Sequence, residues 1–69
     1  MKYKVNTYKL DLILSERKIS QEQLSRLSEL SSVTISKILN GKSCTMDSLN
    51  KIAKTLNLEP YDLLPYSEN

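Results

Sequence analysis

The sequence predicts an all-α domain of five short helices, and three observations lead to this prediction. Apolar residues recur at helical spacing in four successive segments, which favours amphipathic helices over strands. Residues that favour helix caps stand before these segments, and the connections between the segments are short. The single glycine and the two prolines fall where the pattern predicts that helices stop or start.

The size and composition of the chain limit what it can do. Residues 1–69 are expected to form one domain, and a chain this short buries only about 60% of the surface that its unfolded form exposes. A deep substrate pocket has no room in such a domain. Histidine is absent and Cys44 is the only cysteine, which excludes a zinc site, an internal disulfide and a histidine-based triad. We therefore expect no enzyme, no metal and no cofactor.

The charges are distributed unevenly around a net charge of +2. Residues 30–58 carry four basic groups and one acidic group, whereas residues 59–69 carry three acidic groups and no basic one. A basic middle favours a polyanionic partner, although a solvated face explains such an excess equally well. The single thiol, the lysine-rich N-terminus without a signal sequence and the lack of an apolar run of roughly 18 residues predict a cytoplasmic protein without membrane contact.

The first third of the chain predicts an extended start and two helices. Residues 1–6 alternate between polar and apolar, which indicates a short strand or an ordered arm. The first helix is expected over about residues 8–17, with Asn6 or Thr7 as its cap and an apolar stripe of Leu10, Ile13 and Leu14.

Residues 20–23 then form a capping-box pattern that opens a second helix at about residues 21–28. In this helix Leu24 and Ser28 are expected to face inward, with Leu27 at the edge of the stripe. Only Glu29 and Leu30 separate this helix from the next cap, Ser31 or Ser32. Such a short gap forces a steep crossing between the two helices, as in a helix-turn-helix.

The third helix, at about residues 32–40, is predicted to have two different faces. At 100° per residue, Ile35, Ile38 and Leu39 fall on one side and form a core face. The opposite side carries Val33, Ser36, Lys37 and Asn40, and Asn40-Gly41 stops the helix.

A fourth helix is expected over about residues 46–57, behind a cap at Thr45 or Cys44. Its apolar stripe comprises Met46, Leu49, Ile52, Ala53 and Leu56, and Asn57 suits a left-handed terminator. Pro60 then favours the start of a fifth helix at residues 61–64, which Pro65 ends. We expect Cys44 to be a small, partly buried residue and not a redox sensor.

Several of these segments together resemble a known family. The segments SQEQL (residues 20–24), TISKILNGK (34–42), LNKIAKTLNL (49–58) and DLL (62–64) resemble the phage-repressor (Xre/Cro-like) helix-turn-helix family, in order and in spacing. The resemblance covers nearly the whole chain. It implies a five-helix lambda-repressor-like domain that binds double-stranded operator DNA as a homodimer.

The resemblance also implies roles for individual residues. Base-reading positions correspond to Ser32, Val33 and Lys37. The positions that hold backbone phosphates correspond to Gln21, Asn40, Gly41 and Lys42, and we add Ser36 and Ser43, of which Ser43 is otherwise a plain loop residue. Phasing from the sequence puts Val33, Lys37 and Asn40 on the outer face of the third helix independently of this resemblance.

The chain departs from the family pattern at five positions, of which Ser25 and Leu27 stand where an alanine and a polar residue are common. Glu29 stands where many members have a glycine in a left-handed turn, and glutamate would cost on the order of 1 kcal/mol there if its φ is positive. Leu14 and Leu39 stand where many members carry an arginine and a glutamate. Since packed apolar groups often replace such an ion pair without loss, we expect these two leucines to pack in the core.

These observations predict a sequence-specific DNA-binding transcriptional regulator, a repressor, that acts in the cytoplasm on the nucleoid and has no evident small-molecule ligand. The third helix is expected to lie in the major groove. The alternative is an antitoxin-like or anti-repressor module that binds a protein through the same fold, with Val33 in the interface. The dimer surface is expected at Tyr3–Val5 and the fifth helix, both remote from the third helix, while Tyr61, Leu64 and Tyr66 belong to the core or to that surface.

Overall fold

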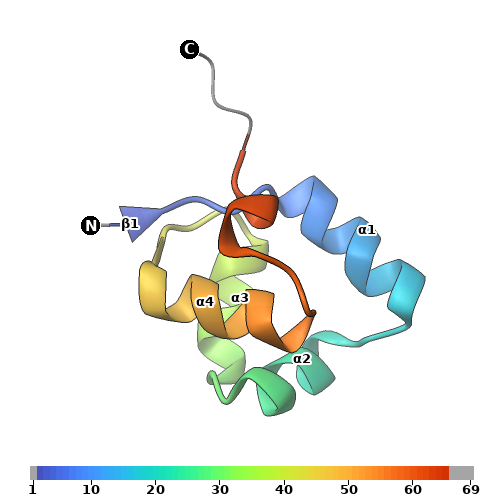
Figure 1. The fold of residues 1–69 in the computed structure, drawn as a ribbon. Helices are drawn as coiled ribbons and strands as arrows, with labels where there is room; N and C mark the ends of the chain where they lie inside the picture. Colours follow the sequence, from blue (N-terminus) through green and yellow to red (C-terminus); the bar gives the residue numbers. More distant parts are fainter. Residues whose placement is uncertain (1, 66–69) are drawn as a thin grey trace.

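Four α-helices, one turn of 3₁₀ helix and a two-stranded sheet make up the described part of the chain (Figure 1). The computed structural model describes residues 2–65. The elements in chain order are β1 (Lys2–Tyr3), α1 (Thr7–Arg17), α2 (Gln21–Ser28), α3 (Ser32–Leu39), β2 (Cys44–Thr45), α4 (Met46–Thr55) and the 3₁₀ turn η1 (Pro60–Leu63). The predicted helical domain is therefore confirmed for four helices, and the strand alternative is confirmed for the start of the chain.

The prediction of a fifth α-helix is wrong, because η1 is a single 3₁₀ turn. Glu59 before the turn and Leu64 after it are both extended, with ψ values of 148° and 155°. Leu64 precedes Pro65, whose ring disfavours the α conformation in the residue before it. Only one turn fits between these two extended residues. Tyr66, which we had placed in the core or at a dimer surface, lies outside the described residues.

Each α-helix begins at a side chain that caps its first turn. The capping oxygens belong to Asn6, Ser20, Ser31 and Thr45, and they accept hydrogen bonds of 3.0–3.2 Å from backbone amides three residues later. At Ser20 the predicted capping box is complete, since the Gln23 side chain accepts the Ser20 amide at 2.9 Å. These contacts show which of the alternative capping residues is used at each helix. A cap of this kind typically contributes about 1 kcal/mol to the stability of the protein.

Each α-helix also ends in the same way, with a residue of positive φ. These residues are Lys18 (57°), Glu29 (64°), Gly41 (89°) and Asn57 (61°). In every case this residue and the next donate backbone hydrogen bonds back into the last turn, which is the Schellman arrangement. The predicted roles of Asn57 and Gly41 as helix stops are confirmed. Glu29 adopts the left-handed turn in spite of its side chain.

We expect the substitution Glu29→Gly to raise the free energy of unfolding by up to roughly 1 kcal/mol. Glycine adopts a positive φ without the steric cost that glutamate has there, although it also loses more freedom on folding. Urea unfolding at pH 7 measures the change. Glu29→Ala is the matched control, since it removes the same carboxylate and keeps the strain. An equal gain in both variants would assign the effect to charge instead of backbone conformation.

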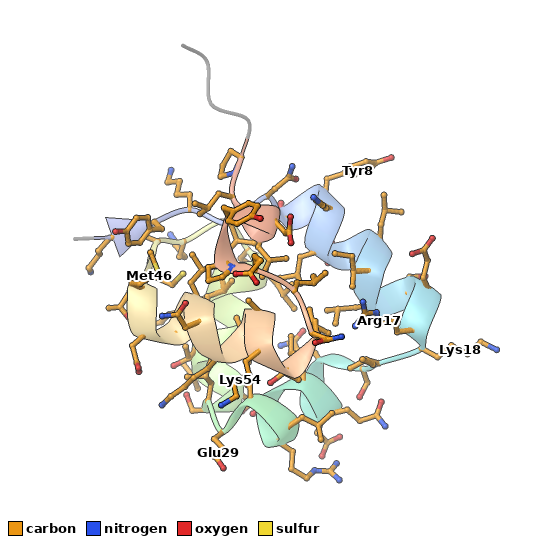
Figure 2. The ribbon with its side chains drawn as sticks, viewed as in Figure 1. Tyr8, Arg17, Lys18, Glu29, Met46 and Lys54 are labelled. Carbon is orange, nitrogen blue, oxygen red and sulfur yellow. The ribbon has the colours of Figure 1, made fainter. Side chains whose placement is uncertain are left out.

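The core lies where the four helices meet. The largest fully buried side chains are Leu10, Leu24, Ile35, Ile38, Leu49, Ile52, Leu56 and Leu63. Leu14 belongs to this core and Leu39 packs against it, as expected for residues that replace an ion pair. Ser28 is buried as predicted, whereas Met46 is exposed because it begins α4 at the edge of the domain (Figure 2). Within residues 2–65, no helix has both the length and the apolar character that a bilayer crossing requires.

Two contacts connect elements that are far apart in the sequence. The Arg17 side chain, at the end of α1, donates a hydrogen bond to the Leu56 carbonyl at the end of α4 (Figure 2). A guanidinium at this position satisfies a carbonyl that the helix leaves without a partner and favours the negative end of the helix dipole. The Asn6 amide donates to the Leu63 carbonyl at 2.7 Å, which ties the start of α1 to η1.

The short sheet places the start of the chain next to α3. β1 and β2 are antiparallel, with Lys2 opposite Thr45 and Tyr3 opposite Cys44. Because β2 follows directly after the turn that ends α3, a strand paired with it also lies near α3. Lys2 borders the same cavity as Thr34 and Lys37 of α3, so the start of the chain is closer to the third helix than we expected. Val5, which we had placed at a dimer surface, is a core residue with 5% of its surface exposed.

Candidate nucleic-acid interface

The two predicted faces of α3 are clearly separated in the structure. Ile35 and Ile38 are buried, with exposed fractions of 0% and 1%, and they fix the helix on the core. On the other side, Ser32 and Lys37 are exposed, and Val33 has 61% of its surface in solvent. An apolar side chain on an otherwise polar, exposed helix face is available for contact with an apolar group of a partner. The prediction that these three residues face outward is confirmed.

The start of α3 resolves which serine caps the helix. The Ser31 hydroxyl accepts the Thr34 amide at 3.1 Å and donates to the Thr34 hydroxyl at 2.9 Å. Ser32 is the first residue of the helix, and the cap does not use its side chain. The Ser32 hydroxyl therefore stays available at the exposed end of the helix.

The end of α3 uses its backbone amides internally. The Gly41 amide donates to the Ile38 carbonyl at 3.1 Å, and the Lys42 amide donates to the Lys37 carbonyl at 3.0 Å. These two amides are therefore not free to bind a phosphate. Gly41 has no side chain and contributes only its positive φ of 89°. Because the Lys42 amide is engaged, Lys42 can contact a phosphate only through its exposed side chain.

Asn40 keeps some of its hydrogen-bonding capacity although it also closes the helix. Its Nδ2 donates to the Ser36 carbonyl at 2.9 Å and lies 3.5 Å from the Ser36 hydroxyl. The side-chain amide carries two protons; the contact with the Ser36 hydroxyl is the longer and weaker one, so its proton exchanges most easily for a ligand, and Oδ1 is a further acceptor. Ser36 is half-buried beneath Asn40, and Ser43 is exposed in the loop before β2.

The residue that follows the turn distinguishes α3 from the other helices. After the turns that end α1, α2 and α4, the next residues are Ile19, Leu30 and Leu58, which pack against the core. An apolar residue at this position is the usual companion of a Schellman turn. After α3 the same position holds Lys42, a cation exposed to solvent. The loop after α3 therefore carries an exposed positive charge at the position where the other three loops carry an apolar side chain packed on the core.

Gln21 lies at the other predicted phosphate position. It is exposed at the first turn of α2, directly after the Ser20 cap. Backbone amides and the positive end of the helix dipole favour an anion at such a position. α2 and α3 pack against each other, which fixes Gln21 relative to the outer face of α3.

Sequence reasoning missed Lys2 as a residue of this surface. A cavity of about 200 Å³ lies between β1, α3 and the start of α4, and both Lys2 and Lys37 line it. The alternating pattern of residues 1–6 signalled a strand. Nothing in the sequence signalled its pairing with residues 44–45, so the neighbourhood of the two lysines could not be predicted.

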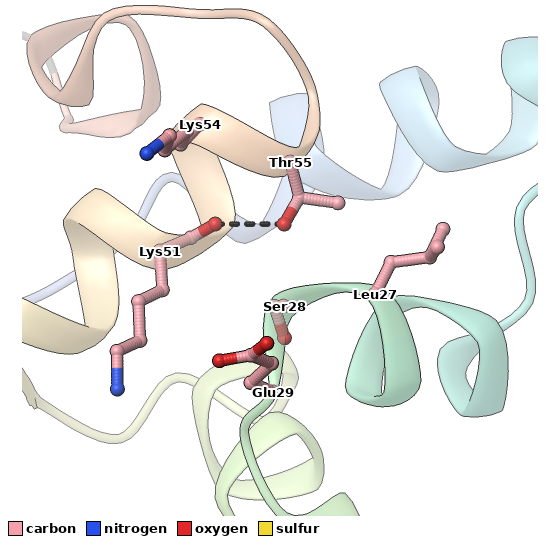
Figure 3. Close-up of a pocket in the computed structure, with 6 residues that line it drawn as sticks. All are labelled: Leu27, Ser28, Glu29, Lys51, Lys54 and Thr55. Atoms are coloured by element: carbon pink, nitrogen blue, oxygen red, sulfur yellow. Dashed lines mark hydrogen bonds between the residues drawn. The ribbon is translucent and has the colours of Figure 1, made fainter.

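A larger hollow lies elsewhere and contains none of the predicted site residues. It measures about 380 Å³ between the end of α2 and the second half of α4, and Figure 3 shows the six residues that line it. Its lining includes Glu29, Lys51 and Lys54, and the Thr55 hydroxyl donates to the Lys51 carbonyl at 2.8 Å. Lys51 also pairs with Asp47 at 3.4 Å. This open hollow of mixed charge points to no particular ligand.

Cys44 is buried in β2, and burial raises the pKa of its thiol above the ordinary value of 9.0. The reactive thiolate is therefore scarce at neutral pH in the folded protein. We expect a maleimide at pH 7.5 to react with Cys44 at least roughly tenfold more slowly in buffer than in concentrated urea. Equal labelling rates in buffer and in urea would contradict the buried position.

The raised pKa of the Cys44 thiol also makes stability depend on pH. As the pH rises above 9, the thiol of the unfolded chain ionises before the thiol of the folded protein, so the free energy of unfolding falls there.

A comparison with protein families agrees with this geometry. The model of the Cro/C1-type HTH DNA-binding domain matches residues 9–69. No protein of curated function matches the sequence. The match includes α2, the turn at Glu29 and α3, and it leaves out β1. The chain belongs to the Cro/C1-type helix-turn-helix family of DNA-binding domains.

Proposed function

We propose that the protein is a sequence-specific transcriptional regulator, a repressor, that inserts α3 into the major groove of double-stranded operator DNA. The observation that carries the proposal is the exposed face of Ser32, Val33 and Lys37 on a helix whose other face is fixed in the core. A helix of this kind fits the width of the major groove, where each base pair presents a distinct pattern of donors and acceptors. Blocking a promoter in this way needs no catalytic group.

Base reading in this proposal divides among three side chains. Lys37 donates to guanine O6 and N7, while Val33 packs against a thymine methyl group. Ser32 both donates and accepts, so it tolerates several bases. Lys37 and Val33 therefore supply most of the specificity, and Ser32 adds contact.

Phosphate contacts hold the helix in register without reading sequence. In this proposal Gln21 holds a phosphate at the start of α2, and Asn40 holds one with the amide proton that otherwise makes the long contact of 3.5 Å with the Ser36 hydroxyl. Lys42 adds charge from its side chain, and Ser36 and Ser43 are the other side chains of the predicted set, while Gly41 supports the loop through its backbone. A cation on the loop after α3 reaches the phosphates that border the groove.

We further propose that two copies bind together, since one module of this size offers about 600–1,000 Å² to DNA. Two-fold partners would read half-sites about one helical turn apart. With Val5 in the core, the surface beside η1 is the better candidate for the contact. Tyr61 supports this choice, because 71% of its surface is exposed there.

Selection from a pool of random duplexes tests the proposal directly. The expected result is an enriched sequence with two-fold symmetry, bound on the order of 10³-fold more tightly than random duplexes. The affinity is expected to fall steeply between 50 and 200 mM salt because counterions leave the phosphates on binding. No enrichment, together with tight binding to a protein, would favour an antitoxin-like or anti-repressor module instead.

A further inference from the structure

We propose that Lys2 of β1 is a further DNA-contacting residue, which binds a backbone phosphate in the cavity between β1, α3 and the start of α4. This inference rests on the proposed function, and it adds a contact that the outer face of α3 does not contain. The cavity has a volume of about 200 Å³ and is bordered by three separate segments, which contribute Lys2 from β1, Thr34 and Lys37 from α3, and Thr45 and Ser48 from the start of α4.

The position of Lys2 follows from the sheet. Lys2 is opposite Thr45 in the antiparallel register, and Thr45 is the cap of α4. Figure 1 shows β1 beside the start of α4. The backbone pairing therefore holds Lys2 beside the start of α4. An unpaired segment would sample many positions instead. A phosphate in this cavity would lie next to Lys37 and thus next to the base that Lys37 reads.

The charges around the cavity favour an anion. Its lining contains two lysines and no acidic residue. The ion pair found among residues 2–65 joins Lys51 to Asp47, so neither Lys2 nor Lys37 has an acidic partner in that part of the chain. Lys2 therefore lacks an opposite charge in this cavity, and a phosphate bound there supplies one, while Lys37 stays free for the base edge.

The hydroxyl groups of the lining add hydrogen-bond donors to the positive charge of the lysines. Ser31 donates to the Thr34 hydroxyl at 2.9 Å, and Thr45 donates to the Ser48 hydroxyl at 3.3 Å. Each pair ends at a hydroxyl that borders the cavity, Thr34 or Ser48, whose own proton has no acceptor among the described residues. Phosphate oxygens accept such protons, and hydroxyl donors together with lysines are the usual partners of DNA phosphates.

The test is the substitution Lys2→Gln, with Lys4→Gln as its matched control. Lys4 is exposed, carries the same charge two residues away and does not line the cavity. Affinity is measured for the selected operator and for a random duplex at several salt concentrations. We expect Lys2→Gln to weaken both duplexes by the same factor, roughly threefold to tenfold, and to reduce the slope of log affinity against log salt by about one. Lys4→Gln should change both quantities much less.

Two results with these variants would overturn the proposal. Equal losses for Lys2→Gln and Lys4→Gln would mean that only the net charge of the segment matters. A loss on the operator alone would make Lys2 a base reader and not a phosphate contact. Thermal unfolding of both variants checks that the fold is intact, and Ser48→Ala offers a second probe. It removes a donor of the cavity and keeps the backbone hydrogen bond from Ser48 to the Thr45 cap.

A titration of the unmodified protein with inorganic phosphate distinguishes this proposal from the proposed function. Amide shifts at Lys2, Thr45 and Ser48 that follow phosphate, and that Lys2→Gln abolishes, support the anion site even if no duplex is bound. In that case the regulator function fails and the site takes a free phosphate group. Specific operator binding that is insensitive to Lys2→Gln has the opposite meaning: the proposed function stands and this inference fails.

Discussion

The substitution Leu24→Ala is expected to destabilise the domain by about 2–5 kcal/mol, the range for a buried leucine that leaves a cavity. Leu24 is fully buried in α2, where it packs in the core that holds α3 in place. A domain of this size has a total stability of only several kcal/mol, so a loss in this range unfolds a large part of the population at 25 °C. Urea unfolding followed by circular dichroism measures the change.

Leu27→Ala is the matched control for this prediction. Leu27 belongs to the same helix and has 61% of its surface in solvent, so the same substitution should change the free energy of unfolding by less than about 0.5 kcal/mol. A comparable loss at both positions would contradict the assigned faces of α2. It would also mean that the outer side of α2 is covered in solution.

Lys37→Ala is expected to cost about 1–3 kcal/mol of binding to the operator and to relax the preference at one base pair. Binding to random duplexes should fall far less, because Lys37 is assigned to a base edge. The measurement is a second selection with the variant, followed by affinities for duplexes that differ only at the relaxed position. Equal losses on operator and random DNA would make Lys37 a phosphate contact.

Two further variants serve as controls for the result with Lys37→Ala. Lys54→Ala removes an exposed lysine from α4, away from α3, and should leave the selected sequence unchanged. Gln21→Ala should weaken all duplexes alike, because Gln21 is assigned to a phosphate. A selective loss for Gln21→Ala would contradict that role.

The helices of this protein could be predicted because their signals are local. Asn6, Ser20, Ser31 and Thr45 each cap the helix that follows directly, and the apolar spacing identifies the buried face of each helix. Such signals depend on residues within one or two turns of each other. The bounds of α2 were therefore predicted to the residue, as Gln21–Ser28.

The features that the sequence did not predict depend on distant residues or on competition between neighbours. The partner of β1 lies more than forty residues along the chain, and a two-residue strand has no pattern that specifies it. At η1, Pro60 favours a helix, but Pro65 keeps Leu64 extended and leaves room for one 3₁₀ turn. At Glu29 the family resemblance suggested a left-handed turn, and only the structure gives the φ of 64°.

The exposure of the candidate site residues on α3 could be predicted, whereas the hydrogen bonds of the loop after α3 could not. Periodicity alone put Val33, Lys37 and Asn40 on the exposed face of α3. It did not reveal that the amides of Gly41 and Lys42 are already used to end the helix. A loop whose backbone is internally satisfied binds through its side chains, and this distinction needs the hydrogen bonds themselves.

The pairing of β1 with β2 has a consequence for how the domain folds and opens. Contacts within and between successive helices are close in sequence and form quickly, whereas residue 2 meets residue 45 only after most of the chain is in place. A strand of two residues, held by pairing with one other short strand, is also the kind of element that opens first, without global unfolding. The helical body and the N-terminal strand would then exchange amide hydrogens on different timescales. The strand would dock late and open early, beside the helix that we propose to read DNA.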